Sequence, residues 1–243
     1  MTRTLIVNAD DFGQSAGVNR GIIEAHERGI VTSASLMVRW PHVEEAAAYA
    51  RSHRSLAVGL HVDLGEWRFR DGAWHAAYEV VSHDDRPAIA AEVQRQLQRF
   101  RDLVGDDPTH LDSHQHVHRT GPVRRVLREL SESLVLPLRH VTETVRYCGD
   151  FYGQETTGEP LHAAIRPEAL AALVAALPPG VTELACHPGF ADDLDSMYAA
   201  ERAMEVAALC DPRVTRALGA HGIALVSFRE VSARLRAARG DRS

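Results

Sequence analysis

The amino-acid sequence predicts an α/β fold in which repeated βα units build a parallel sheet of about seven strands. Short apolar segments rich in β-branched residues alternate along the chain with longer amphipathic or alanine-rich segments, which is the pattern of such units. The chain has 243 residues and contains no repeat, low-complexity tract or Gly/Ser linker. Because β/α barrels reach this length as one unit, we predict a single domain over residues 1–243.

The predicted strands are short apolar runs, and their number is close to that of a closed barrel. They cover residues 4–9, 33–38, 57–62, 109–113, 138–141, 182–186 and 223–227. The predicted helices lie between them, at residues 17–28, 42–51, 87–104, 122–133, 167–177, 196–210 and 230–239, and several have proline in the first turn. Residues 66–85 and 146–162, rich in Gly, Trp, Tyr and Thr, are predicted to be long loops that line a binding cleft.

The charge of the chain favours a small neutral or polar ligand over nucleic acid. The formal net charge is −6, and the basic residues cluster only at positions 234–242. All 27 basic residues are arginine, because the sequence contains no lysine. This excludes a Schiff-base lysine, a pyridoxal phosphate anchor and a P-loop lysine.

Cysteine use and hydropathy predict a soluble protein of a reducing cytoplasm. Cys148, Cys186 and Cys210 are an odd number without CxxC spacing, so neither a disulfide framework nor a cysteine-built zinc site is expected. The first apolar run is too short for a signal peptide, and residues 169–177 fall well short of the ~20 residues that span a bilayer. No membrane partner is expected, and the oligomeric state stays open, a homodimer included.

Polar side chains follow several predicted strands at their carboxyl ends. Asp10 and Asp11 follow the first strand, His61 lies at the end of the third, His114 follows the fourth and His187 follows the sixth. In α/β barrels and open sheets this is the face where side chains from different strands converge on a substrate. The pattern therefore predicts a functional site.

The adjacent carboxylates Asp10 and Asp11 indicate metal chemistry. Two buried neighbouring carboxylates are costly to keep ionised unless they share a cation or a proton, which suits one as metal ligand and the other as general base. The alternative is a helix or turn cap. The acidic pocket of a receiver domain is a further alternative, but the lysine that such a pocket requires is missing.

Histidines supply the remaining candidate ligands. Apolar side chains alternate with other residues over positions 58–64, which places His61 on the face opposite the apolar side chains. A metal-ligand role for His61 is therefore as plausible as a structural role. Residues 110–118 contain His110, Asp112, His114, His116 and His118, a density that favours metal binding. All five share a face if the chain is extended, whereas His114 and His118 share a face if it is helical, so the ligand assignment stays open.

His187 and Ser15 suggest two different enzymes. His187 precedes a Pro-Gly turn, a position suited to a general acid with a pKa near neutrality, although an ordinary loop histidine explains it equally well. Ser15 lies in Gly13-Gln-Ser-Ala-Gly17, which matches the nucleophile elbow of a serine esterase. The strand end that an elbow serine needs is occupied by Asp10 and Asp11, so a helix cap is the simpler interpretation of Ser15.

The motifs together resemble one family closely. They are Asn8-Ala-Asp-Asp-Phe-Gly13, Gly59-Leu-His61, His110-Leu-Asp-Ser-His114-x-His116-Val-His118 and Cys186-His-Pro-Gly189, with Tyr198-x-x-x-Arg202-x-x-Glu205 further on. In these motifs the chain resembles the YdjC-like, ChbG-type carbohydrate deacetylases over nearly its whole length. The resemblance implies a distorted β/α barrel that acts on an N-acetylated sugar or oligosaccharide.

The resemblance also implies roles for individual residues. It implies one divalent metal ion, Mg²⁺ in that family, held by Asp11, His61 and His114, with Asp10 as catalytic base; two nitrogens and one oxygen also suit Zn²⁺, Co²⁺ or Mn²⁺. We expect His187 to be the general acid that protonates the leaving amine.

Three further residues are expected to bind the substrate: Asp112, His116 and Arg202. A protein that binds metal or sugar without catalysis remains the alternative outside enzymology.

Overall fold

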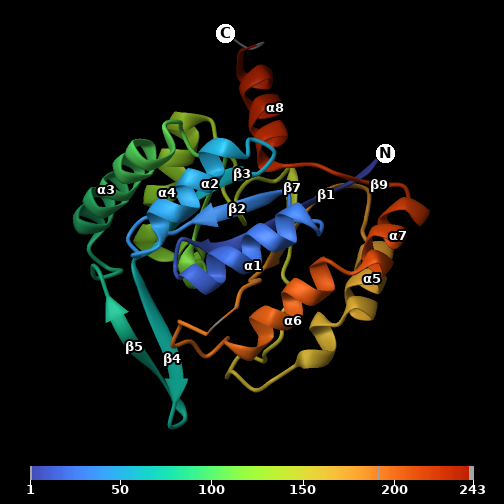
Figure 1. The fold of residues 1–243 in the computed structure, drawn as a ribbon. Coiled ribbons are helices and arrows are strands. Elements are labelled where there is room, and N and C mark those ends of the chain that lie inside the picture. Colours follow the sequence, from blue (N-terminus) through green and yellow to red (C-terminus); the bar gives the residue numbers. More distant parts are fainter. Residues whose placement is uncertain (1, 191, 241–243) are drawn as a thin grey trace.

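A parallel sheet curls through the middle of the protein, and its central strand is β1 (Arg3–Phe12) (Figure 1). The computed structural model describes residues 2–190 and 192–240. The other strands of this sheet are β2 (Ser33–Leu36), β3 (Ala57–Val62), β6 (Leu111–Ser113), β7 (Val145–Cys148), β8 (Gly180–Cys186) and β9 (Ile223–Leu225). Their order is β6-β3-β2-β1-β8-β7, with β9 paired to β1. The sheet is a half-barrel, and the predicted α/β fold with parallel strands is confirmed.

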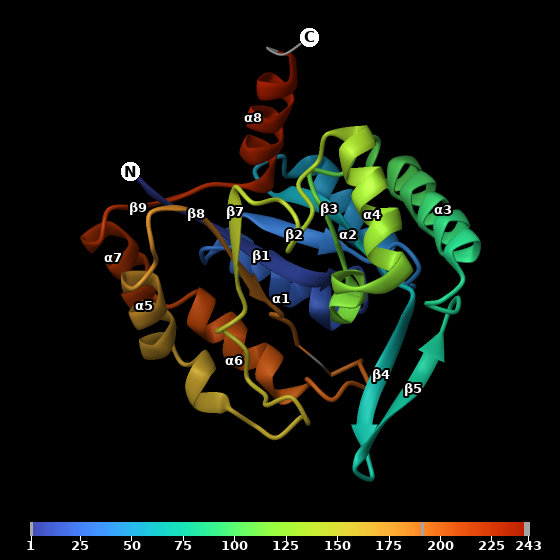
Figure 2. The same cartoon turned by 180° about the vertical axis from the view of Figure 1, so that it is seen from behind.

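Helices cover this sheet on its outer side, whereas the C-terminal helix packs with Phe228 and Val231 against Ile6 and projects from the body (Figures 1 and 2). They are α1 (Ala16–Glu27), α2 (Val43–Ser52), α3 (Arg86–Val104), α4 (Gly121–Leu134), α5 (Pro167–Ala175), α6 (Ala200–Leu209), α7 (Pro212–Ala220) and α8 (Phe228–Gly240), with the 3₁₀ helices η1 (His114–Arg119) and η2 (His162–Ile165). Among the described residues, none of these helices combines the length and apolarity needed to cross a membrane.

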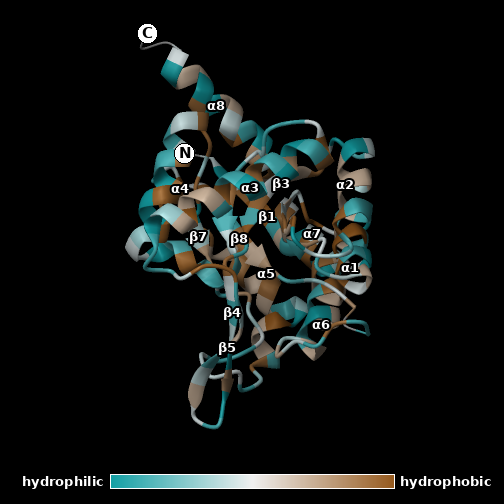
Figure 3. Ribbon diagram, turned by 90° about the vertical axis from the view of Figure 1, so that its left-hand side faces the viewer, coloured by the Kyte–Doolittle hydropathy of each residue, from teal (hydrophilic) through white to brown (hydrophobic). Residues whose placement is uncertain are grey.

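The core lies between the sheet and the helices. Every residue of β1 from Leu5 to Phe12 is buried, as expected for the central strand of a sheet covered by helices. Hydrophobic residues concentrate on the strands and on the helix sides that face them (Figure 3). On α3, for example, Ile89, Val93 and Phe100 are buried at helical spacing and hold that helix on the sheet.

One predicted strand is wrong. Residues 138–141 do not form a strand: Leu138 makes only an isolated bridge to Leu111, and the chain then turns at His140, whose φ is 60°. The strand forms instead at β7, inside a segment predicted to be loop. This turn matters for the site, because it directs Arg139 inward.

The segment 66–85 was predicted to be a loop, but most of it is a β-hairpin. Strand β4 (Gly65–Arg70) pairs with β5 (Ala73–Glu79) in a separate two-stranded antiparallel sheet. Asp71 and Gly72 form its tip with φ of 52° and 76°, which is the left-handed pair that a two-residue hairpin turn requires. The hairpin projects from the body of the protein beside the sheet (Figures 1 and 2).

Candidate active site

A cavity of about 610 Å³ opens at the carboxyl ends of the strands. Asp10, Asp11, His61, His114 and His187 all line it, so the structure brings together the strand-end residues that the sequence singled out. A cavity of this size suits a small organic ligand.

The strand β1 changes its pairing where the carboxylates lie. Its register with β2 shifts between Ala9 and Phe12, and Asp11 has a φ of 69°. In a regular strand, consecutive side chains point to opposite faces, whereas an irregularity of this kind redirects a side chain. Asp10 and Asp11 therefore both reach the same cavity.

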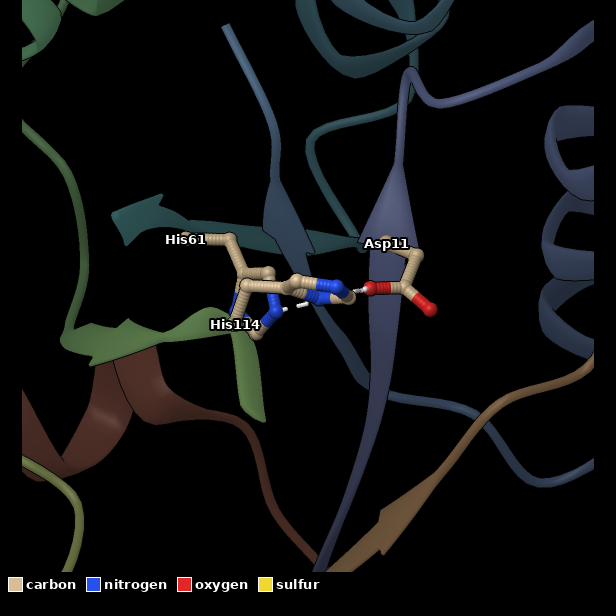
Figure 4. Close-up of side chains that lie close together, drawn as sticks. All are labelled: Asp11, His61 and His114. Atoms are coloured by element: carbon tan, nitrogen blue, oxygen red, sulfur yellow. Dashed lines mark hydrogen bonds and ion pairs between the residues drawn. The ribbon is translucent and has the colours of Figure 1, made fainter. Parts of the chain in front are cut away.

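Asp11, His61 and His114 form a compact group (Figure 4). Asp11 Oδ1 lies 3.1 Å from His114 Nδ1 and 3.5 Å from His61 Nε2. One ligand atom from each residue lies within 4.8 Å of the others, a spacing that could hold a metal ion. His114 Nε2 is buried without a hydrogen-bond partner. One carboxylate and two imidazoles are a common ligand set for a divalent metal, so these residues fit the metal that the family resemblance implies.

His61 is oriented by Asp112. Its Nδ1 lies 2.8 Å from Asp112 Oδ1, which leaves Nε2 directed at Asp11. A carboxylate behind a ligating imidazole fixes the orientation of the ring in many metal sites. Asp112 is fully buried and is not part of the cavity wall. The structure thus places Asp112 behind His61 and not among the cavity residues, where a substrate contact would be expected.

The charges around the imidazoles favour cation binding. Burial opposes a charge on His61, but Asp112 and Asp10 raise its pKa to about 10. For His114, burial again opposes the charge, but its hydrogen bond to Asp11 and the Glu66 carboxylate, 3.7 Å from Nε2, raise the pKa to about 9. The site thus stabilises positive charge between two imidazoles, and a divalent cation would displace the protons on binding.

Arg139 holds Asp10 in place, and sequence reasoning missed it. Its Nη1 and Nη2 donate to the two carboxylate oxygens of Asp10 at 2.6 and 2.8 Å. The same guanidinium contacts Asp112 at 2.9 Å and Glu183 at 2.7 Å. Burial opposes ionisation of Asp10, but Arg139 lowers its pKa below the usual value. Asp10 is therefore an oriented, ionised carboxylate at the edge of the cavity.

Arg202 performs the matching role for Asp11. It extends from α6, and its Nη2 donates to Asp11 Oδ2 at 2.6 Å. Its side chain lines the cavity, as expected of a substrate-binding residue, but its charge is engaged with Asp11. Each of the two adjacent carboxylates thus has its own arginine, which explains how both stay ionised inside the protein.

His187 lies beside Asp10, with its Nε2 3.9 Å from Asp10 Oδ2. Its backbone N–H donates to Glu205, and its Nδ1 is buried without a partner. Burial lowers the pKa of His187 to about 4, so the ring is neutral near pH 7. This differs from the near-neutral pKa expected from the sequence, because the flanking rings of Tyr152 and Tyr198 desolvate it.

The other histidines of the 110–118 segment divide into structural and cavity residues. The ring of His110 stacks on Phe228 at a centroid distance of 3.9 Å, and His118 is buried between Ser113 Oγ and the carbonyl oxygen of Arg139. Both support the fold. His116 lines the cavity. The segment is a strand up to Ser113 and then a 3₁₀ helix, so neither regular geometry considered for it applies throughout.

Ser15 acts as a helix cap. Its Oγ accepts the backbone N–H of Val18 at 3.1 Å and donates to Asp193 at 2.8 Å. It does not line the cavity, and its hydrogen bonds within the described residues involve no histidine. A serine nucleophile requires a base within hydrogen-bond reach, so this geometry favours the cap over the esterase.

Comparison with known proteins decides the family. Residues 4–220 match the family model of the YdjC-like proteins. The chain belongs to the YdjC-like family. Among its curated relatives, the "Carbohydrate deacetylase" of Geobacillus stearothermophilus is 36% identical over 95% of this chain and 98% of that protein. The "Chitooligosaccharide deacetylase" of Enterobacter sp. (strain 638) is 35% identical over 94% of this chain and 99% of that protein.

Solved structures share the fold of this YdjC-like protein. A crystal structure from Enterococcus faecalis V583 matches with a TM-score of 0.75 and 27% identity over 95% of this chain and 99% of that one. A family 4 carbohydrate esterase from Streptomyces lividans, solved with acetate, matches with a TM-score of 0.57 and 15% identity over 92% and 91% of the two chains. The second match is one of fold alone.

Proposed function

We propose that this chain is a metal-dependent carbohydrate deacetylase, a hydrolase that releases acetate from an N-acetylated amino sugar or oligosaccharide. The observation that carries the proposal is the Asp11–His61–His114 group beside the ionised Asp10 in one cavity. The 36% identity to a protein named carbohydrate deacetylase, over nearly the full length of both chains, supports the same reaction.

Asp11, His61 and His114 would hold one divalent cation. Bound there, the cation would polarise the amide carbonyl and lower the pKa of a bound water. The family resemblance favours Mg²⁺, whereas two nitrogens and one oxygen are equally suited to Zn²⁺, Co²⁺ or Mn²⁺.

Asp10 is proposed as the general base. It accepts a proton from the water that attacks the acetyl carbon, and Arg139 keeps the accepting carboxylate in one orientation. The carbon–nitrogen bond then breaks, and the amine must gain a proton. His187 is neutral before the reaction, so we propose that it receives the proton from Asp10, 3.9 Å away, and passes it to the amine. The products are acetate and the free amino sugar.

The residues that line the cavity suit a sugar as the substrate. The cavity wall combines aromatic rings with polar side chains, among them Tyr147, Tyr152, His116 and Gln154. Sites of this composition bind polar ligands that also have apolar faces. Within this wall, we keep His116 as a substrate contact. We propose a reducing cytoplasm as the location of this protein, where Cys148, Cys186 and Cys210 would stay free thiols.

Acetate release from a panel of N-acetylated mono- and oligosaccharides tests this function. We expect release from at least one of them, with an equal amount of free amine formed. Binding of these sugars without any release of acetate would instead support a non-catalytic sugar-binding protein.

A further inference from the structure

The β4–β5 hairpin forms one wall of the cavity and carries an exposed tryptophan. Trp74, near the tip, is 51% exposed and lines the cavity together with Trp67 and Arg68 of the opposite strand. The large hydrophobic side chains exposed among the described residues are Trp74, Tyr152, Leu161 and Leu225. Trp74 and Tyr152 both line this cavity, so the exposed aromatic surface gathers where a ligand would bind.

The hairpin is held in position by its base. Isolated two-stranded hairpins are marginally stable, but this one is tied to the body at three points. Trp67 exchanges two backbone hydrogen bonds with the side chain of Gln115, each 2.8 Å long. Tyr78 donates to the buried Asp63 at 2.8 Å. Arg68 pairs with Asp195 of the loop before α6 at 2.7 Å.

These contacts place Trp74 further than Trp67 from the Asp11–His61–His114 group, beside which the acetyl group would react. Gln115, which binds Trp67, is the neighbour of the candidate ligand His114. Trp74 pairs with Phe69, two residues beyond Trp67 along β4. Two residues of a strand span about 7 Å, so Trp74 stands one step outward along the same wall. The ring of Phe69 contacts that of Trp74 edge-on at a centroid distance of 5.6 Å, and about half of Trp74 stays exposed to solvent.

We propose that Trp74 is the platform of an outer sugar subsite and is the residue that favours a longer saccharide over a single N-acetylated sugar. The inference rests on the proposed function and adds a specificity-determining residue to it. The exposed indole ring packs against the apolar face of a sugar residue that does not lose its acetyl group, while the reacting residue lies beside Asp10. A single sugar held by the inner residues would leave Trp74 without a contact.

The test uses the β-linked trimer of N-acetylglucosamine as the probe. In Trp74→Ala we expect the KM for the trimer to rise roughly tenfold, with the loss falling on KM rather than on kcat, because one stacking contact is removed far from the chemistry. Trp74→Phe should recover most of the loss. His75→Ala is the matched control, since His75 is an exposed neighbour on the same strand and does not line the cavity.

Equilibrium binding separates this inference from the proposed function. Calorimetric titration of the trimer into Asp10→Asn, with and without Trp74→Ala, should show a roughly tenfold weaker Kd in the double variant. An unchanged Kd and KM, a loss in kcat alone, or no binding of the trimer to Asp10→Asn overturns the subsite. Trimer binding that depends on Trp74, without acetate release by the unmodified protein, keeps the subsite and refutes the deacetylase.

Discussion

Asp10→Asn is expected to lower kcat for acetate release by roughly 10²–10⁴-fold, the usual contribution of a general base. Asparagine has the shape of aspartate but cannot accept the proton of the attacking water. Asp10 is not in the Asp11–His61–His114 group, and its own grouping with His61 and Asp112 is already neutralised by Arg139, so the variant should still bind one metal ion per chain. Steady-state kinetics and metal analysis of the same preparation check both parts.

Asp193→Asn is the matched control for this experiment. Asp193 is a carboxylate that caps the start of α1 through Ser15 and Gly17 and does not line the cavity. The kcat of Asp193→Asn should stay close to that of the unmodified protein. Near-normal kcat in Asp10→Asn, or loss of its metal, would remove Asp10 from the role of base.

Arg139→Leu is expected to destabilise the fold by about 3–5 kcal/mol, the range measured when one partner of a buried ion pair is removed. The guanidinium is fully buried and contacts three carboxylates, those of Asp10, Asp112 and Glu183. Without it, buried negative charges face one another. For a chain of this size the loss corresponds to a Tm lower by roughly 10 °C, which calorimetry measures directly.

The control for Arg139 is Arg99→Leu. Arg99 pairs with Glu44 on the surface at 2.8 Å, with 50% and 67% of the two side chains exposed, so its removal should cost at most about 1 kcal/mol. Equal stability of the two variants would show that Arg139 does not hold the carboxylates together. If Arg139 positions Asp10, a folded Arg139→Lys should also show a lower kcat, because lysine cannot bind both oxygens of Asp10.

The sequence predicted the convergence of Asp10, Asp11, His61 and His114 because a parallel sheet collects its carboxyl ends at one edge. This rule needs only the order of strands along the chain. The roles within the 110–118 segment could not be assigned, because they depend on where the strand ends. The chain turns into a 3₁₀ helix at His114, which leaves His110 and His118 in the interior.

Arg139 was missed for a different reason. It is one of 27 arginines in the sequence, and its role comes from the turn at His140 that replaces a predicted strand. Contacts with Asp10 and Glu183, 129 and 44 residues away, leave no local pattern. The hairpin, in contrast, had a local signal. Asp71-Gly72 lies between two segments whose aromatic residues, Trp67 and Phe69 before it and Trp74 and Tyr78 after it, are spaced by even numbers of residues, a typical hairpin signature.

Acetate release with and without EDTA tests the central claim of metal-dependent hydrolysis most directly. The assay uses the N-acetylated saccharide that the panel identifies, and Mg²⁺, Zn²⁺, Co²⁺ or Mn²⁺ is then added back. We expect EDTA to abolish release and at least one of these ions to restore it. Release that continues unchanged in EDTA, from protein shown to contain no metal, would contradict the role assigned to Asp11, His61 and His114.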